Sequence, residues 1–163
     1  YPHFQLGNLV ESFVEEALAS HYGRDSVKNS FRIELDYDDF KIVGQTDPVL
    51  VGPNAEPEKL FEVKSTKNIS FREEEPSKHH VMQVHPYMKA LDLDSCTFIY
   101  VQKTDLSVVS HEVPFSEKTF SEGLERMEKL HKDLVRHGPP VPEPFMDFEC
   151  RFCSYKEKCK QDG

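Results

Sequence analysis

The sequence has 163 residues, of which 37% are hydrophobic and 30% are charged, and its formal net charge is -9. This length suits one domain whose core needs no disulfide bonds. No apolar run approaches the roughly 18 residues of a membrane span, and no signal peptide is visible, so we expect a cytoplasmic protein without a membrane partner. The acidic balance argues mildly against nucleic acid, although carboxylates gathered around a metal ion would produce the same balance.

Hydrophobic periodicity predicts three helices and five strands. In chain order, we expect a helix over residues 6–18, strands over 31–35, 40–43 and 60–64, a helix over 79–92, strands over 97–101 and 107–113, and a helix from about 116 to the Gly-Pro-Pro sequence at 138–140. Strands that alternate with helices in this way favour an α/β fold, with a mixed sheet of about five strands flanked by helices.

A glutamate and a lysine stand two positions apart in the strand expected over residues 60–64. Glu62 and Lys64 therefore share one face of that strand, while their apolar neighbours point to the other face. Asp47 precedes Glu62 by fifteen residues, and a hairpin-like return of the chain would bring the two carboxylates together. The pattern predicts a site made of two acids and one amine.

Two carboxylates, water and a phosphate oxygen form a hard oxygen site that suits Mg²⁺ or Mn²⁺. An ion held by Asp47 and Glu62 would polarise a phosphate and lower the pKa of its bound water. Lys64 could orient that water or stabilise the negative charge that develops during hydrolysis. The carbonyl of Val63 lies between the two side chains of the strand and could complete the ligand shell. The alternative is a surface ion pair between Glu62 and Lys64.

Four short motifs occur in the order and spacing found in the RecB-like branch of the PD-(D/E)XK nucleases. In that branch they read Gly-x-x-x-His on a first helix, then Gly-x-x-Asp, Glu-x-Lys and Gln-x-x-x-Tyr. In this sequence they are Gly7 to Glu11, Gly44 to Asp47, Glu62 to Lys64 and Gln83 to Tyr87. The chain resembles this branch, which implies a restriction-endonuclease-like α/β core followed by a Cys-rich tail.

The resemblance also implies a role for each matching residue. Asp47 and Glu62 would be metal ligands, and Lys64 would be the catalytic lysine. Gln83 and Tyr87 would support the catalytic site and contact DNA.

The sequence departs from the family pattern at two positions. Glu11 stands where many relatives have a metal-ligating histidine. A glutamate can also ligate a metal or hold a metal-bound water, so Glu11 keeps a metal-binding role with a changed metal preference. Pro86 interrupts the helix that carries Gln83 and Tyr87, and we expect it to kink or restart that helix, which affects the reach of Gln83.

Three cysteines lie close together near the C-terminus: Cys150, Cys153 and Cys159. Thiolates at this spacing favour an iron–sulfur cluster or zinc over a disulfide framework, since no secretion signal is visible. The alternative is that they are reduced and bind nothing. Cys96 starts an apolar strand, so we expect it to pack in the core rather than bind a metal.

Similar C-terminal cysteines occur in the CRISPR-associated branch of the RecB-like nucleases (the fourth-numbered Cas family) and in AddB-type nucleases. The resemblance runs from Gly7 to Cys159. It implies a [4Fe–4S] cluster held by the three C-terminal cysteines and by a fourth cysteine upstream of Tyr1; zinc or an empty site remains open. We expect residues 1–139 to form the nuclease domain and residues 140–163 to form the Cys-rich segment packed on it.

Together these features predict a metal-dependent DNA exonuclease that acts on single-stranded DNA or strand ends. The resemblance implies a role in CRISPR spacer acquisition or recombinational repair, with other adaptation or recombination proteins as partners. Two alternatives are a catalytically weak DNA-binding or assembly module of the same fold and a small zinc-ribbon protein. Three histidines near the Gln–Tyr motif are expected to face solvent: His79, His80 and His85.

Overall fold

The computed structural model describes residues 2–136, 144 and 149–162. The chain forms two compact units, residues 1–120 and 121–163, and the boundary falls within helix α3 (Glu117–Val135). The predicted domain boundary at 139–140 and the expected Gly-Pro-Pro helix stop lie outside the described residues. Among the described helices, none combines the length and apolar character needed to cross a membrane.

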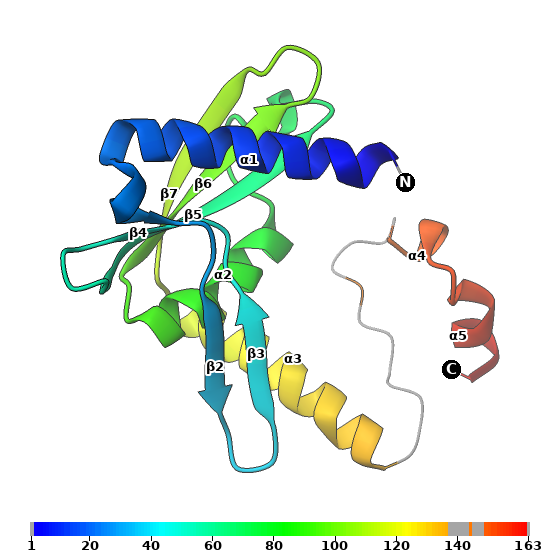
Figure 1. The fold of residues 1–163 in the computed structure, drawn as a ribbon. Helices are drawn as coiled ribbons and strands as arrows, with labels where there is room; N and C mark the ends of the chain where they lie inside the picture. Colours follow the sequence, from blue (N-terminus) through cyan, green and yellow to red (C-terminus); the bar gives the residue numbers. More distant parts are fainter. Residues whose placement is uncertain (1, 137–143, 145–148, 163) are drawn as a thin grey trace. The chain divides into compact units, whose positions relative to one another are not determined.

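The first unit is built on a mixed sheet of five strands (Figure 1). In spatial order the strands are β1 (Val27–Lys28), β4 (Val49–Val51), β5 (Pro57–Thr66), β6 (Ser95–Gln102) and β7 (Val108–Pro114). The central pair, β5 and β6, is parallel, and the other three pairs are antiparallel. The predicted α/β fold with a mixed five-stranded sheet is confirmed.

Two helices cover opposite faces of this sheet (Figure 1). Helix α1 (Pro2–Tyr22) buries Val10 and Val14 against Val63 of β5. Helix α2 (Lys78–Leu91) buries Val84 and Met88 in the cluster that contains Leu60. Because side chains alternate along a strand, Leu60 and Val63 point to opposite faces. The middle of β5 is therefore covered on both sides, and residues 60–63 are all buried.

Helix α2 runs as one element through Pro86. Of the two outcomes predicted for Pro86, a restart of the helix is therefore wrong, and a kink stays a prediction. Proline removes one backbone donor, and its ring crowds the carbonyl four residues earlier. Packing of the surrounding helix compensates for this cost, since Val84, His85 and Met88 are all buried. Gln83 and Tyr87 thus stay on one continuous helix.

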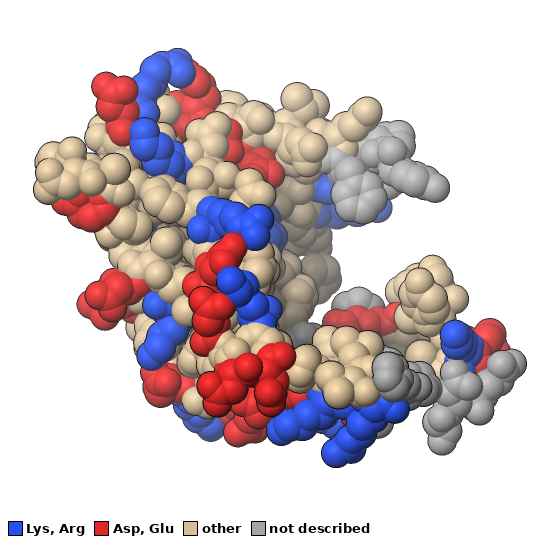
Figure 2. Space-filling view, turned by 60° about the horizontal axis from the view of Figure 1, so that its bottom comes forward, with Lys and Arg blue, Asp and Glu red and all other residues tan. Residues whose placement is uncertain are grey.

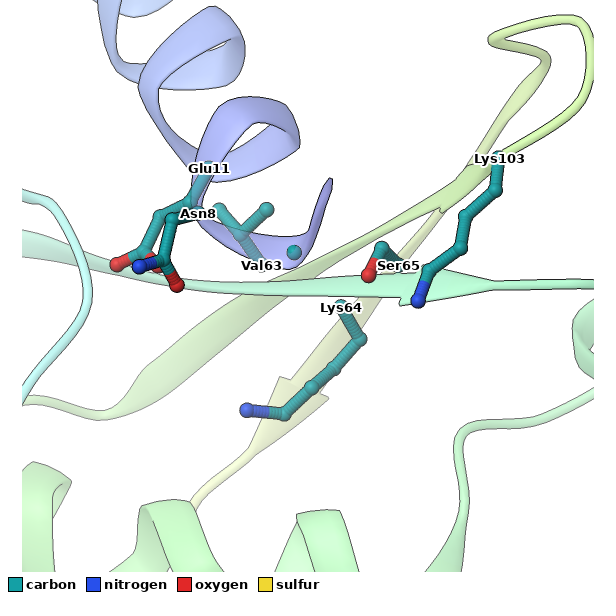
Figure 3. Close-up of a pocket in the computed structure, with 7 residues that line it drawn as sticks. Asn8, Glu11, Val63, Lys64, Ser65 and Lys103 are labelled. Carbon is teal, nitrogen blue, oxygen red and sulfur yellow. The ribbon is translucent and has the colours of Figure 1, made fainter. Parts of the chain in front are cut away.

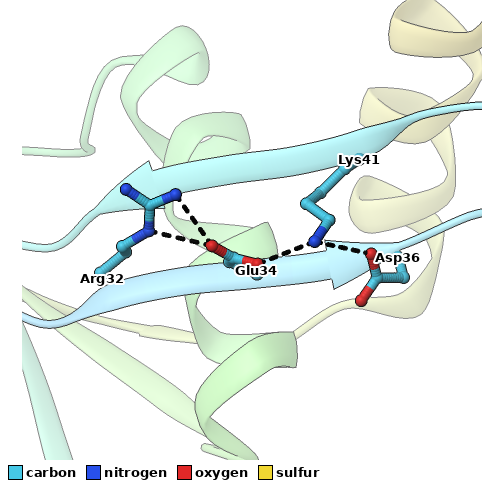
Figure 4. Close-up of polar contacts among 4 residues, drawn as sticks. All are labelled: Arg32, Glu34, Asp36 and Lys41. Atoms are coloured by element: carbon cyan, nitrogen blue, oxygen red, sulfur yellow. Dashed lines mark hydrogen bonds and ion pairs between the residues drawn. The ribbon is translucent and has the colours of Figure 1, made fainter.

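The predicted hairpin over residues 31–43 is confirmed, but it forms a sheet of its own. Strands β2 (Arg32–Asp36) and β3 (Lys41–Gln45) pair antiparallel with each other and not with the main sheet. Charged side chains line one face of this hairpin, where Glu34 contacts both Arg32 and Lys41 and Lys41 also contacts Asp36 (Figure 4). These groups are solvent-exposed, so their net contribution to stability is small.

The main sheet reaches five strands through two short strands, β1 and β4, which the sequence analysis missed. The segment between β5 and α2 contains one short 3₁₀ helix, η2 (Ser70–Arg72), and another, η1 (Arg24–Ser26), precedes β1. Two short helices follow α3 in the second unit: α4 (Glu149–Phe152) and α5 (Lys156–Asp162).

Candidate active site

The site lies beside the start of strand β4, where the pairing of β4 with β5 stops and one edge of β5 is left unpaired. The pairing of β4 with β5 reaches only from Pro57 to Leu60, and the Phe61 N–H donates to the carbonyl of Pro48. Beyond that point no strand of the described chain pairs with this edge. The next amide that faces this unpaired edge, the Val63 N–H, donates instead to Oδ2 of Asp47 at 2.8 Å. The Val63 carbonyl faces the same edge, since both backbone groups of a paired residue point to one side.

The position of Asp47 is fixed by the residue before it. The backbone N–H of Thr46 donates to the Phe31 carbonyl (2.9 Å), and the Thr46 hydroxyl accepts from the Phe31 N–H (2.9 Å). Thr46 itself is buried. Burial raises the pKa of Asp47, while the hydrogen bond from Val63 and the nearby Lys64 oppose the shift. Asp47 is therefore a partly desolvated carboxylate held against β5.

Glu62 is the most unusual side chain of the core. Only 1% of it is exposed, and Lys64 apart, no described residue donates a hydrogen bond to either carboxylate oxygen. The Lys64 ammonium forms an ion pair with Oε1. Burial, reinforced by the negative charge of Asp47, raises the pKa of Glu62 to about 7, although Lys64 acts in the opposite direction. A buried acid with a single charged partner and a raised pKa is costly for the fold and therefore a candidate for function.

Lys64 lies on the same face of β5 as Glu62 and keeps 26% of its side chain exposed. Burial acts to lower the pKa of Lys64, but the carboxylates of Glu62 and Asp47 outweigh it, and the net shift is upward. The side chain therefore carries its positive charge at neutral pH. The ion pair predicted as the alternative to a catalytic role is present, but it is not a surface pair, because Glu62 is buried.

A third acid reaches this region from helix α1. Burial raises the pKa of Glu11, and the charges of Asp47 and Glu15 raise it further. The pKa of Glu15 is also raised by burial and by Asp47. These shifts place the two helix acids within electrostatic range of Asp47. Glu11 also lines a pocket between α1 and the open edge of β5, together with Asn8 and Val63 (Figure 3).

The acidic side chains of Glu11, Asp47 and Glu62 suit a divalent cation. Glu11, Asp47 and Glu62 are partly or fully buried, and the charge of Asp47 raises the pKa of both glutamates. A cation between the three acids would relieve that repulsion. Their oxygens are ligands that Mg²⁺ and Mn²⁺ prefer. Within the described residues, however, no three His, Cys, Asp or Glu side chains converge closely enough to form a complete metal site.

The Gln–Tyr motif lies beside the lysine. The Gln83 side-chain amide donates to the Tyr87 hydroxyl at 3.5 Å, and Tyr87 contributes to the raised pKa of Lys64. Gly44 explains how the ring fits: a Cβ atom at this position would lie 2.7 Å from Cε1 of Tyr87. The glycine of the Gly-x-x-Asp motif thus admits the tyrosine ring of the last motif.

The histidines of α2 are not uniformly solvent-facing. The expectation is wrong for His85, which is buried and lies 2.7 Å from the Val81 carbonyl and 3.1 Å from the backbone N–H of Ser116, which donates to it. His80 is half-buried, with its Nδ1 2.9 Å from the Tyr100 hydroxyl. Burial, together with the neighbouring cations, lowers the pKa of His80 to about 3, so it is neutral near the site.

The cysteines divide into two groups. Cys96 is fully buried in the core, as predicted, and burial raises the pKa of its thiol. Cys150, Cys153 and Cys159 are free and exposed in the second unit. Their role as cluster ligands stays a prediction. Sequence analysis missed three other residues that line the pocket of Figure 3: Asn8, Ser65 and Lys103. No sequence pattern could have identified them together, because each comes from a different part of the chain and the three line one pocket only after folding.

No protein-family model and no curated protein matches this chain. Among solved structures, the chain is similar to SSO0001, with a TM-score of 0.69 and 17% identity over 99% of this chain and 72% of that one. It is also similar to the alkaline exonuclease LHK-Exo from Laribacter hongkongensis, with a TM-score of 0.51 and 14% identity over 82% of this chain and 73% of that one. The complex of LHK-Exo with dAMP gives a TM-score of 0.53 at 13% identity, with coverage of 82% and 72%. The chain therefore shares its fold with a known alkaline exonuclease.

Proposed function

We propose that this protein is a metal-dependent DNA exonuclease that hydrolyses phosphodiester bonds of single-stranded DNA or strand ends. Asp47, Glu62 and Glu11 would hold Mg²⁺ or Mn²⁺ together with the carbonyl of Val63, and Lys64 would be the catalytic lysine. The observation that carries the proposal is the buried Glu62, whose carboxylate has Lys64 as its partner and whose pKa is raised by burial and by the charge of Asp47. A protein retains such a group at a cost to stability when function needs it.

The metal ion would supply the Lewis acid and lower the pKa of the attacking water. The residues of the chain have separate tasks. Asp47 is held by the Val63 N–H, which fixes one carboxylate oxygen and leaves the other free to bind. Lys64 keeps its positive charge beside Glu62 and can hydrogen-bond a phosphate oxygen or the water. Tyr87 and Gln83 would orient Lys64 and contact the DNA strand.

Charge limits how DNA could bind. The net charge is -9, and acidic and basic side chains are interspersed on the face shown in Figure 2. Affinity would therefore depend on local cations and the metal ion rather than on a broad basic surface. The C-terminal cysteines Cys150, Cys153 and Cys159 would bind a [4Fe–4S] cluster, with zinc as the alternative. A role in CRISPR spacer acquisition or in DNA repair is the context that the sequence resemblance implies.

The test is a cleavage assay on end-labelled single-stranded and double-stranded DNA with Mn²⁺, with Mg²⁺ and with EDTA. We expect metal-dependent shortening from strand ends, and we expect Lys64→Ala to reduce the rate at least a hundredfold, the usual order for loss of one electrostatic catalytic group. Lys59→Ala is the matched control, because Lys59 lies on the same strand but pairs with Glu112 on the other end of the sheet.

Two results would change the assignment. Equal rates for the wild type and Lys64→Ala would remove Lys64 from catalysis and point to a contaminating nuclease. DNA binding without any metal-dependent cleavage would favour the catalytically weak DNA-binding module of the same fold.

A further inference from the structure

The pocket between helix α1 and the open edge of β5 has a part that the metal site does not use. Its volume is about 360 Å³, and it is lined by Gly7, Asn8, Glu11, Val63, Lys64, Ser65 and Lys103. In Figure 3, Asn8 and Glu11 lie at one end, and Ser65 and Lys103 lie together at the other. One end is thus acidic and the other carries a hydroxyl and a cation. The side chain of Lys64 points away from this pocket, to the opposite side of the strand.

Lys103 is held in place by its backbone. Its N–H donates to the carbonyl of Thr66 at 2.8 Å, which ties the end of β6 to the end of β5. The turn that follows is closed by hydrogen bonds from Leu106 to the Gln102 carbonyl (3.0 Å) and from Gln102 to the Ser107 carbonyl (2.8 Å). The ammonium of Lys103 is therefore presented from a firmly anchored turn.

The positive charge of Lys103 is not neutralised within the part of the chain that the structure describes. No ion pair joins it to any described carboxylate. Asp105, the nearest acid along the chain, accepts instead from the backbone and hydroxyl of Ser107 and from the Gln102 side-chain amide (3.0 Å). A half-buried lysine beside a hydroxyl, with its neighbouring acid already occupied, matches the donors that bind phosphate.

Gly7 keeps this pocket open. A Cβ atom at Gly7 would meet only Oγ of Ser65, at 3.8 Å, which is ordinary van der Waals contact. Its backbone is helical and not strained, so the fold itself does not require glycine at this position. Glycine within a helix costs stability relative to alanine. The space that it leaves next to Ser65 is therefore better explained by a ligand than by packing.

We propose that Lys103 and Ser65 form a phosphate subsite that binds the nucleic-acid strand one step away from the scissile phosphate. This inference rests on the proposed nuclease function, because the acidic end of the same pocket is part of the proposed metal site. The bound group is a phosphate of the strand, either in the backbone or at its end. Binding there would fix the register of the strand along the open edge of β5, which makes Lys103 a positioning residue.

The test measures binding rather than cleavage, in EDTA, with the full chain and a fluorescent single-stranded oligonucleotide. We expect Lys103→Ala to weaken binding by roughly tenfold, as for one hydrogen bond to a charged group. We expect the slope of log affinity against log salt to fall by about 0.7, as for one lost phosphate contact on a single strand. Lys103→Arg should restore both values, and Lys59→Ala should change neither.

Gly7 provides a second, independent test. Gly7→Ala should leave binding unchanged and raise the melting temperature, because alanine suits a helix better than glycine. Gly7→Leu should fill the pocket and reduce affinity without lowering the melting temperature. Oligonucleotides with and without a terminal phosphate separate the two sources of the bound group: an equal loss in Lys103→Ala indicates a backbone phosphate, and a loss confined to the phosphorylated strand indicates an end phosphate.

An unchanged affinity and salt slope in Lys103→Ala would overturn the inference, as would full binding by Gly7→Leu. These outcomes are distinct from failure of the proposed function, which would appear as absent metal-dependent cleavage whatever the behaviour of Lys103.

Discussion

Replacing the buried acid Glu62 with glutamine should make the metal-free protein more stable. Burial raises the pKa of Glu62 from 4.5 to about 7. At pH 8 the folded protein must carry this group ionised, and the shifted pKa corresponds to a cost of about 3 kcal/mol relative to the unfolded chain. The attraction to Lys64 is already contained in this value, since Lys64 lowers the pKa of Glu62. Glutamine resembles the protonated acid and avoids the cost of ionisation.

The pH dependence follows from the direction of the shift. Between about pH 4.5 and pH 7 the folded state holds a proton on Glu62 that the unfolded state has released. The contribution of this group is therefore fully present below pH 4.5, and stability is lost as the pH rises to about 7. Glu62→Gln removes this dependence, so its advantage should be small at pH 5 and should reach its maximum near pH 8.

The assay is thermal unfolding in EDTA at a series of pH values between these limits. About 3 kcal/mol corresponds to a rise in melting temperature of roughly 6 to 12 °C for a chain of this size. Glu58→Gln is the control, because it removes the same charge from an exposed position on the same strand. Adding Mn²⁺ should stabilise the wild type and leave Glu62→Gln unaffected. A gain that is equal at pH 5 and pH 8 would refute the reasoning, since it could not come from ionisation of Glu62.

Two further substitutions test the supports of the site. Gly44→Ala should destabilise the fold by about 1 to 3 kcal/mol in denaturant unfolding, because its Cβ would lie 2.7 Å from the Tyr87 ring. In a Tyr87→Ala background this loss of stability should be smaller. An unchanged loss in that background would show that the ring is not the cause. His85→Leu should cost about 1 to 3 kcal/mol, because Val81 and Ser116 lose their hydrogen-bond partner. His21→Leu, at an exposed position of α1, should stay within about 0.5 kcal/mol, and a similar loss in both histidine variants would contradict the proposed role of His85.

The sheet and its helices could be predicted because their patterns are local. The apolar positions of the first helix and of the β2–β3 hairpin repeat at helical and strand periods, and these elements appear where they were expected. Strands β1 and β4 have only two and three residues, too few for any period to be visible. Strand β4 forms by pairing with β5, and β1 forms by pairing with β4. Both strands therefore depend on contacts in the folded chain that a local pattern does not contain.

The environment of Glu62 could not be predicted from its spacing. A separation of two positions places Glu62 and Lys64 on one face of β5, and the spacing says no more than that. Whether that face is covered depends on α2, whose Val84 and Met88 pack beside it from more than twenty residues away. Because helices cover both faces of the sheet, the acid of this Glu–Lys pair is buried and its pKa is raised.

The two ends of the pocket also differ in whether their residues could be found from the sequence. Its acidic end contains Glu11, which a motif could locate because the residue keeps a fixed spacing from Gly7. Its basic end combines Ser65 with Lys103, which meet only because β5 and β6 run parallel and end at the same edge of the sheet. A parallel pair brings the carboxyl ends of both strands together, so side chains of remote sequence position meet there. A strand of DNA laid along the open edge of β5 would cross from the acids to this cation, and for that reason the loss of Lys103 should be visible in binding even where the metal is absent.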